Sequence, residues 1–428
     1  VGLVRLRRPP AVAAGAEGPR CYRGSPPSPG WDAVVNKRLT VSKDPKAGGR
    51  FRTIGAALKA AQPGRTIHVL DGETYAESLR LDRPELHQGV RLVAVKDATL
   101  TISKDIGTAI VIDDVPDVHI QGFRFKGQEP VRGSTFVRIR KNAAGVVLSD
   151  LDFQAAEPVT GITIENVAVA ESGNPLLVRK CKFRVGFDGI SVVGPGGNDG
   201  GKSVTSGIRL EDNRCMGCLR GIHLEGTLAD IMIAGNVAAN CLQEGIGIAN
   251  LSAATRRVLI LNNSLHHCAF GFRVWGESPD NKLSLGKIEF RAIICSEGQH
   301  VDIGYVQLGR PGVKGDPTPG DGLVLIDRWL FADNWRDLSG MSRLYLVPLA
   351  KGDKKLDLND LESREWSDVN FLRPRLKSSL ATGGAGGDLP DYAGAVPPDG
   401  VQAWDWDKTW TARKTKTVPQ KTAPAEKP

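Results

Sequence analysis

Residues 208–276 decide the fold, because one short pattern occurs there three times. The copies read IRLEDNRCMGCLRGIHLEG at 208–226, IMIAGNVAANCLQEGIGIAN at 231–250 and VLILNNSLHHCAFGFRVWG at 258–276. Each copy has an apolar segment, an Asn, a Cys five residues later and a Gly that opens a second apolar segment. Successive Asn residues are 23 and 27 positions apart, which predicts one coil of a parallel β-solenoid per copy.

Stacked coils place equivalent residues about 4.8 Å apart. Asn213, Asn236 and Asn263 are therefore expected to form a ladder that hydrogen-bonds neighbouring coils and tolerates left-handed backbone. Counted from Ile110 to Ile303, the frame gives roughly eight coils. Residues two positions after the Asn are predicted to form an inward stack: Phe125, Phe153, Phe183, Cys215, Ala238, Leu265 and Cys295.

Composition agrees with this β architecture. Of the 428 residues 41% are hydrophobic and only 6% are aromatic, and the chain contains 50 Gly. This balance argues against a helical bundle and favours turn-rich β structure. No segment approaches the roughly 18 consecutive apolar residues of a membrane span, so no membrane contact by the chain itself is expected.

The net charge of +8 is located at the two ends of the sequence. Residues 1–20 carry a net charge of +3 and residues 408–428 a net charge of +5, so residues 21–407 are formally neutral. This distribution does not indicate a basic binding face on the folded part, and nucleic acid is not expected as a partner. Residues 1–39 are predicted to be a disordered linker and residues 408–428 a disordered basic tail.

A short helix is predicted before the repeats. Residues 51–61 have apolar side chains at helical spacing, with Thr53 as the N-cap and a Pro-Gly stop signal at 63–64. Strand-forming segments follow. The helix is expected to cover the apolar end of the solenoid.

The helix, the following strands and the repeats together resemble the pectin lyase-like right-handed β-helix superfamily. The resemblance covers residues 40–305 and implies an all-β, single-stranded right-handed parallel β-helix with an N-terminal helix cap and a C-terminal extension. It leaves the activity open, because the superfamily includes lyases, hydrolases, esterases and proteins without known catalysis. Its N-terminal part is carried by Thr53-Ile54 through Pro63-Gly64, Asp71-Gly72, Tyr75 and Glu77.

The cap and solenoid are predicted to span residues 40–312. Residues 313–407 lose the repeat and are predicted to form a C-terminal capping extension, because an open solenoid end must be covered. This segment is rich in Trp, and the rings are expected to pack over the last coil. An aromatic-rich carbohydrate module is the alternative.

The candidate site lies on the sheet made by the Gly-opened strands. With Ile190, Ile222, Ile246 and Phe272 directed inward, alternation directs two rows of side chains outward. The first row is Ser191, His223, Gly247 and Arg273, and the second is Val193, Glu225, Ala249 and Trp275. Asp188, Arg220 and Glu244 stand directly before the glycines.

The predicted ligand-binding residues are His223, Glu225, Arg273 and Trp275. Trp can stack on a sugar ring, Arg can bind a carboxylate with two hydrogen bonds, and paired carboxylates can act as acid and base. Candidate catalytic groups are Glu225, Glu244, Asp188 and His223. The alternative is a solvated face whose charges keep the solenoid soluble.

Catalytic motifs of the resembled superfamily are mostly absent. There is no Asn-Thr-Asp, no Ser/Gly-His-Gly and no Arg-Ile-Lys at the expected strands. Leu308–Pro311 and Val301–Ile303 resemble two pectin methylesterase motifs, but here they are adjacent instead of being widely separated.

Seven Cys residues, an odd number, do not suggest a disulfide framework. Cys218, Cys241 and Cys268 fall in one column, whereas the ligands of a tetrahedral zinc site must converge on one point. They are predicted to be reduced, buried thiols. No metal and no cofactor is expected.

These observations favour a non-catalytic carbohydrate-binding or recognition module, with a polysaccharide or oligosaccharide as its partner. Residues 39–51 also resemble the β-helix region appended to large bacterial Ser/Thr kinases, which implies the sensor part of a signalling protein. The superfamily resemblance implies a bacterial, extracytoplasmic setting, although residues 1–30 contain no signal peptide. Two alternatives stay open: a lyase or glycoside hydrolase acting on uronic-acid-containing polysaccharide, and a structural stalk.

Overall fold

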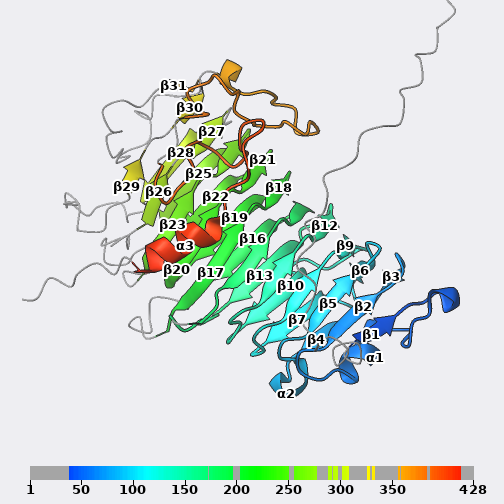
Figure 1. Ribbon diagram of the computed structural model, residues 1–428. Coiled ribbons are helices and arrows are strands. Elements are labelled where there is room, and N and C mark those ends of the chain that lie inside the picture. Colours follow the sequence, from blue (N-terminus) through cyan, green and yellow to red (C-terminus); the bar gives the residue numbers. More distant parts are fainter. Residues whose placement is uncertain are drawn as a thin grey trace, which may run out of the picture. The chain divides into compact units, whose positions relative to one another are not determined.

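The computed structural model shows a parallel β-solenoid in which the coils from β2 to β28 each contribute one strand to each of three sheets, A, B and C (Figure 1). All neighbouring strands within the three sheets are parallel. The structure describes residues 38–171, 173–195, 203–249, 255–276, 288–291, 293–296, 301–307, 325–327, 330–332, 355–356, 358–382 and 386–415.

The strand bounds follow the order of the coils. Sheet A contains β1 (Arg38–Val41), β2 (Thr66–Val69), β5 (Arg91–Ala94), β8 (His119–Gln121), β11 (Val147–Ser149), β14 (Leu176–Arg179), β17 (Thr205–Glu211), β20 (Leu228–Ala234), β23 (Arg256–Leu261), β26 (Ile288–Arg291) and β29 (Leu325–Asp327). Sheet B contains β3 (Thr74–Tyr75), β6 (Thr99–Ile102), β9 (Arg124–Gly127), β12 (Asp152–Ala155), β15 (Lys182–Val185), β18 (Arg214–Met216), β21 (Val237–Ala239), β24 (Ser264–His266), β27 (Ile294–Ser296), β30 (Leu330–Ala332) and β31 (Lys355–Leu356). Sheet C contains β4 (Leu79–Leu81), β7 (Thr108–Asp113), β10 (Thr135–Arg140), β13 (Thr160–Glu165), β16 (Asp188–Val193), β19 (Arg220–Glu225), β22 (Glu244–Ala249), β25 (Phe270–Gly276) and β28 (Val301–Gln307).

Helices are few and short. The described α-helices are α1 (Ile54–Lys59), α2 (Pro84–His87) and α3 (Trp406–Thr415), and the 3-10 helices are η3 (Pro45–Ala47) and η6 (Leu358–Asp360). No helix in these ranges is long and apolar enough to cross a membrane. The predicted all-β solenoid is confirmed, and the eight coils expected between Ile110 and Ile303 correspond to the sheet C strands from β7 to β28.

Along sheet B the predicted inward stack is confirmed for its buried members Phe125, Phe153, Phe183, Cys215, Ala238 and Leu265. The register aligns its members in sequence, from Phe125 to Cys295. The ring centroids of Phe125 and Phe153 are 4.5 Å apart, and those of Phe153 and Phe183 are 4.8 Å apart. These separations equal the strand spacing of a sheet, so one aromatic column fills the interior of three successive coils.

The Asn ladder is also present, at the corner between sheets A and B. Oδ1 of Asn236 accepts from the backbone N–H of Asn213 at 2.9 Å, and Oδ1 of Asn263 accepts from the backbone N–H of Asn236 at 2.9 Å. All three side chains are buried. The left-handed backbone was expected at the Asn residues but occurs one position earlier, for example at Asp212 (φ 53°) and Asn262 (φ 46°). That preceding residue makes the tight corner, while the Asn stays in a conformation that directs its amide into the solenoid.

The glycines that open the sheet C strands are required by close packing. A Cβ on Gly189 would lie 2.6 Å from the carbonyl oxygen of Gly221 and 2.8 Å from Sγ of Cys215. A Cβ on Gly221 would similarly lie 2.5 Å from the carbonyl oxygen of Gly245. The position directly before each glycine is thereby turned to the outside, and it carries Asp188, Arg220 and Glu244.

The N-terminal segment forms the predicted cap. Oγ1 of Thr53 accepts from the backbone N–H of Ala56, and the carboxylate of Glu77 accepts from the first N–H groups of α1. The carboxylate of Asp71 accepts hydrogen bonds from the hydroxyls of Ser42 and Tyr75 and from the backbone of Lys43. The acidic and tyrosine residues of the resemblance therefore hold the cap together.

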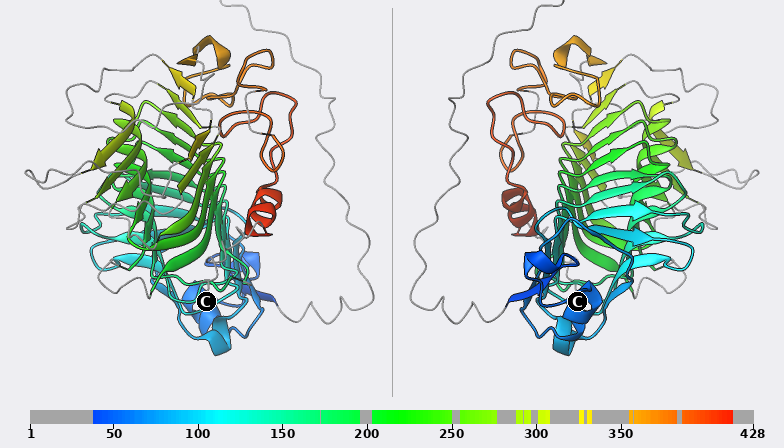
Figure 2. Two further views of the ribbon diagram at one scale, coloured as in Figure 1. Left: turned by 90° about the vertical axis from the view of Figure 1, so that its left-hand side faces the viewer. Right: turned by 90° about the vertical axis from the view of Figure 1, so that its right-hand side faces the viewer.

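The C-terminal segment packs on the side of the solenoid, which differs from the expected position over the last coil. Trp406 in α3 packs in a cluster with Met232, Ala234 and Leu261 on the outer face of sheet A, and its Nε1 donates to Oδ1 of Asp212 at 3.0 Å. Figures 1 and 2 show α3 alongside the stacked strands. The physical reason is that β20 and β23 are apolar on both faces, so their outer face needs a cover.

Other strands and helices also cross the predicted segment boundaries. Strands β29, β30 and β31 lie within 313–407 and pair in sheets A and B. Residues 408–415 of the predicted disordered tail lie in α3. The division of the chain into four segments stays a prediction.

Candidate functional site

The strand register aligns the two outward rows on sheet C as predicted. Ser191 pairs with His223, His223 with Gly247, and Gly247 with Arg273. The second row runs through Val193, Glu225, Ala249 and Trp275 in the same way. The side chain of Trp275 lies outside the described residues.

Most of these positions are more buried than a solvated outer face would be. His223 is 3% exposed, Asp188 is 2% exposed and Glu244 is fully buried. The side chains of Glu225 and Arg273 remain 39% and 25% exposed. The charged groups therefore fall into a buried set and a partly exposed set.

Asp188 and Arg220 form the best-defined ion pair of the site. Nε of Arg220 donates to Oδ1 of Asp188 at 2.6 Å, and Nη2 donates to Oδ2 at 2.8 Å. The guanidinium also lies over the ring of Phe187, with Cζ 5.1 Å from the centroid. Burial raises the pKa of Asp188, and the hydrogen bonds and charge of Arg220 only partly oppose this increase.

His223 connects this pair to the surface. Its Nε2 lies 3.3 Å from Nη1 of Arg220 and 3.5 Å from Oε2 of Glu225. Arg220 can only donate, so its contact requires a neutral imidazole with the proton on Nδ1. The contact with Glu225 instead suits a protonated Nε2. A ligand or proton that changes Glu225 thus also changes the environment of His223.

A second ion pair lies on the next two strands. Nη1 of Arg273 donates to Oε1 of Glu244 at 3.0 Å, and the guanidinium lies over the ring of Phe270, with Cζ 4.6 Å from the centroid. Strand β22 contributes only Gly247 and Ala249 to the two outward rows between His223 and Arg273. Sheet C therefore carries no long side chain in these rows on the strand between Glu225 and Arg273, whose positions are two strands, or about 10 Å, apart.

The candidate carboxylates are not equivalent. The side chains of Asp188 and Glu244 are 3% and 1% exposed, and each accepts a hydrogen bond from an Arg. Glu225 is the candidate whose carboxylate reaches the surface. Acid–base hydrolysis of a glycoside uses two carboxyl groups on either side of one bond, and the three candidate carboxylates Asp188, Glu225 and Glu244 provide one of the two in an accessible position.

No group of three or more His, Cys, Asp or Glu residues is placed to hold a metal ion within the part of the chain that the structure describes. Five cysteines within the described ranges are buried free thiols: Cys181, Cys215, Cys218, Cys241 and Cys268. Burial raises the pKa of Cys181 and of Cys218 to about 12, so these thiols are not nucleophiles at neutral pH.

Arg220 contacts both Asp188 and His223 but is not among the predicted site residues. Its position directly before Gly221, in the same frame as Asp188 and Glu244, is the sequence signal for it. Two sequence features cannot be placed: Leu308–Pro311 and the greater part of the Gly-rich loop at 194–201 lie outside the described residues.

Residues 108–288 match the profile of a family described as "Right handed beta helix region". This match and the three parallel sheets identify the fold class as a right-handed parallel β-helix, in agreement with the right-handed crossovers that parallel strands favour. Residues 108–288 are therefore similar to this family, and the fold of the described solenoid is a parallel β-helix.

Several solved structures are similar to the chain in fold. They include a complex of XylC with xylose (10% identity, TM-score 0.41, covering 69% of this chain and 83% of that chain) and pectate lyase Pel9A (12%, 0.41, 86% and 96%). Pectin methylesterase PemA from Erwinia chrysanthemi is a third (11%, 0.33, 62% and 80%). At these identities and TM-scores the similarities carry no information about activity. No curated protein matches the sequence.

Proposed function

We propose that the protein binds a carbohydrate on the outer face of sheet C and does not catalyse a reaction on it. The observation that carries this proposal is the placement of Glu225 and Arg273. Each is partly exposed, and each contacts a buried charged partner or imidazole. The strand between them presents only Gly247 and Ala249 in the same rows.

Preorganisation is the physical reason to favour binding. Burying Asp188 and Glu244 is costly unless they are paired, and pairing fixes Arg220 and Arg273 in one orientation. A ligand that reaches both partly exposed groups then meets a carboxylate that accepts hydrogen bonds from sugar hydroxyls and a guanidinium that donates to a hydroxyl or a uronic carboxylate. The loss of side-chain conformational entropy on binding is therefore small.

The second candidate function is a polysaccharide lyase or hydrolase. One observation favours it: Nε2 of His223 lies between Arg220 and Glu225, as a general base next to an acid would. The single exposed candidate carboxylate favours binding instead. A signalling role and an extracytoplasmic location rest on the sequence resemblance alone and are not included in the proposal.

Calorimetric titration with neutral and uronic-acid oligosaccharides tests the proposal. Glu225→Gln removes one charge-assisted acceptor and should weaken binding by about 1.5–3 kcal/mol. Glu165→Gln is the matched control, because Glu165 lies in the same row two strands away and is similarly exposed. Trp275→Ala should weaken binding by about 0.5–1.5 kcal/mol if its ring stacks on the sugar.

The same oligosaccharides and their polymers are incubated with the protein and followed by ultraviolet absorbance and by release of reducing ends. Steady product formation that is lost in Glu225→Gln would establish the enzyme and overturn the binding proposal. Equal binding by Glu225→Gln and Glu165→Gln would show that the ligand lies elsewhere, and the absence of any binding would leave the structural stalk.

A further inference from the structure

A second surface, the outer face of sheet B, collects positive charge. Two columns of side chains project from it on β9, β12, β15 and β18. The first column is Arg124, Asp152, Lys182 and Arg214, and the second is Lys126, Gln154, Arg184 and Met216. We call this surface the basic face of sheet B.

Most of these cations are available to a ligand. Lys126, Lys182 and Arg184 are exposed and Arg214 is half-buried. Among the described residues, no carboxylate lies within ion-pairing distance of these four side chains, whereas Arg124 pairs with Asp97 at 2.7 Å. Asp152 is the one acid within the two columns, and it accepts a hydrogen bond from Gln154 at 2.9 Å.

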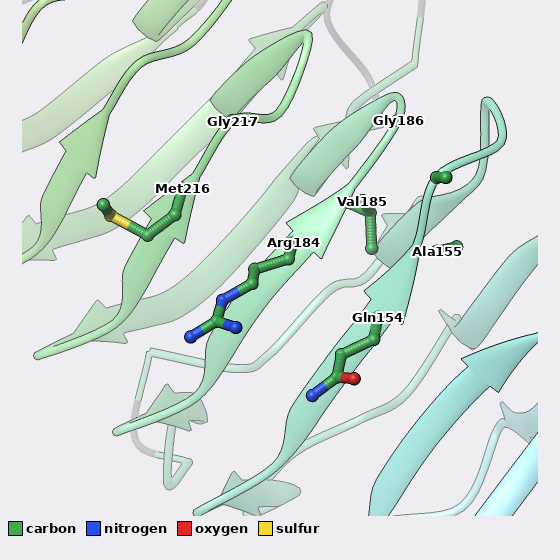
Figure 3. A pocket seen from close by; sticks show the side chains of 8 residues that line it. Gln154, Ala155, Arg184, Val185, Gly186, Met216 and Gly217 are labelled. Atoms are coloured by element: carbon green, nitrogen blue, oxygen red, sulfur yellow. The ribbon is translucent and has the colours of Figure 1, made fainter. Parts of the chain in front are cut away.

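The same face is hollowed where the strands end. Gln154, Arg184 and Met216 project side by side from β12, β15 and β18 (Figure 3), and they line a depression of about 380 Å³ together with neighbouring backbone. Trp366 from the C-terminal extension meets this surface, with Cζ of Arg184 5.4 Å from its ring centroid. The Trp366 side chain is itself nearly half exposed, at 48%.

The basic face ends where the C-terminal extension begins to cover sheet B. On the following coils the outward residues Val237, Ala239 and Ile294 are buried in a cluster with Phe371 and Leu380. The outward Ser264 and His266 on the strand between them are buried as well. The extension thus covers the apolar part of sheet B and leaves the charged part open. Within the described part of the chain, the uncovered face presents four cations without a carboxylate partner, beside the apolar side chain of Met216 and the ring of Trp366.

We infer that the basic face of sheet B binds an acidic polysaccharide, at a site separate from the outer face of sheet C. Its cations lie on β9, β15 and β18, within a group of four strands that spans about 14 Å, so they suit a linear polyanion better than a single phosphate or sulfate. Carboxylates or sulfates of the polymer would pair with Lys182 and Arg184, and the half-exposed indole of Trp366 would contact a sugar ring.

A nucleic acid is the other linear polyanion to consider. Single strands bind on surfaces that offer several aromatic rings for successive bases. The eight outward positions of the basic face carry no aromatic residue, and Trp366 is the one aromatic ring that an observed contact places beside them. The charge and the single ring therefore favour an acidic glycan.

Binding of oligogalacturonate by the full chain tests this inference at several salt concentrations. The double variant Lys182→Gln/Arg184→Gln should lower the affinity about tenfold or more at low salt, and it should flatten the salt dependence because fewer counterions are exchanged. Lys59→Gln/Lys104→Gln is the matched control, since it removes two exposed cations elsewhere. The methyl-esterified oligomer, which lacks the charge, should bind far more weakly than the acid at this site.

Two further variants distinguish a failure of this inference from a failure of folding or of the sheet C proposal. Lys126→Gln is a second variant on the same face, for use if the double variant has a lowered thermal midpoint. Glu225→Gln should leave the Lys182- and Arg184-dependent binding intact, so a failure of the sheet C proposal is recognised separately. Equal affinities of wild type and double variant would overturn the inference. Tighter, equally Lys182-dependent binding of single-stranded DNA would overturn it in favour of nucleic acid.

Discussion

Replacing Arg220 with Met tests whether the Asp188–Arg220 pair supports the face of sheet C. Met keeps the length of the side chain but removes the charge and all donors. Asp188 would lose hydrogen bonds of 2.6 and 2.8 Å while its side chain stays 3% exposed. Breaking a buried ion pair from one side typically costs about 3–5 kcal/mol, because the other charge is left buried without compensation.

The pH dependence gives this prediction a direction. Burial already raises the pKa of Asp188, and loss of Arg220 should raise it further. A carboxyl whose pKa is higher in the folded than in the unfolded state stabilises the fold when it is protonated, and this stabilisation is lost as pH rises through the folded-state pKa. The variant should therefore be least stable, relative to wild type, at pH 8, and it should approach wild type towards pH 4.

Urea unfolding followed by circular dichroism at pH 4, 6 and 8 measures this difference. Arg80→Met is the matched control, because Arg80 pairs with Asp82 at the surface, where the two side chains are 55% and 35% exposed, and exposed pairs contribute about 1 kcal/mol or less. The double variant Asp188→Asn/Arg220→Met should recover much of the loss. Equal unfolding free energies for Arg220→Met and wild type at all three pH values would refute the argument.

Two more predictions concern the ladder and the cap. Asn236→Ala leaves the backbone N–H of Asn213 without its acceptor and should lower the free energy of unfolding by about 3 kcal/mol. Hydrogen exchange of the Asn213 amide should accelerate, whereas substitution of the exposed Asn142 by Ala should change neither quantity. An unchanged exchange rate at Asn213 would contradict the role of the ladder. Burial raises the pKa of Asp71, but hydrogen bonds from Ser42, Tyr75 and the backbone lower it more, so the net pKa lies below its ordinary value. Asp71 therefore stabilises the fold above its unfolded-state pKa, and this stabilisation is lost as pH falls through the folded-state pKa. Acid unfolding should show that loss below pH 4 in wild type and not in Asp71→Asn, and identical acid-unfolding curves would exclude the proposed network.

The repeating features could be predicted from sequence because stacking copies one local environment many times. The inward column from Phe125 to Cys295 and the rows through His223 and Glu225 follow from a frame and an alternation, and the register reproduces both. The left-handed backbone occurs one residue before each Asn instead of at the Asn itself. The repeat frame locates the corner but does not specify which of its residues makes the turn.

The features that were missed depend on contacts between segments far apart in sequence. The burial of His223 cannot be derived from alternation, which specifies only the direction of a side chain. The lateral docking of Trp406 had a signal in the unbroken apolar runs 231–234 and 258–261, because strands buried on both faces lose their polar alternation.

The basic face of sheet B was missed for another reason. The neutral net charge of residues 21–407 is a sum over all faces of the solenoid, and such a sum conceals a basic surface on one of them. Alternation within β9 and β15 places Arg124, Lys126, Lys182 and Arg184 on one side of one sheet, where Asp152 is the one acid in the two columns. Charge therefore has to be counted by face once the register is known.

The lateral position of α3 also sets an order of events during synthesis. Coils can form one after another as the chain emerges, since each coil contacts mainly its neighbours. Met232 and Leu261, however, remain uncovered until Trp406 has been made. At translation rates of about 5–20 residues per second this delay amounts to roughly 10–30 s. During that interval the nascent solenoid exposes an apolar strip to chaperones and to other nascent chains. The strip is covered only when α3 has been synthesised and packs on it.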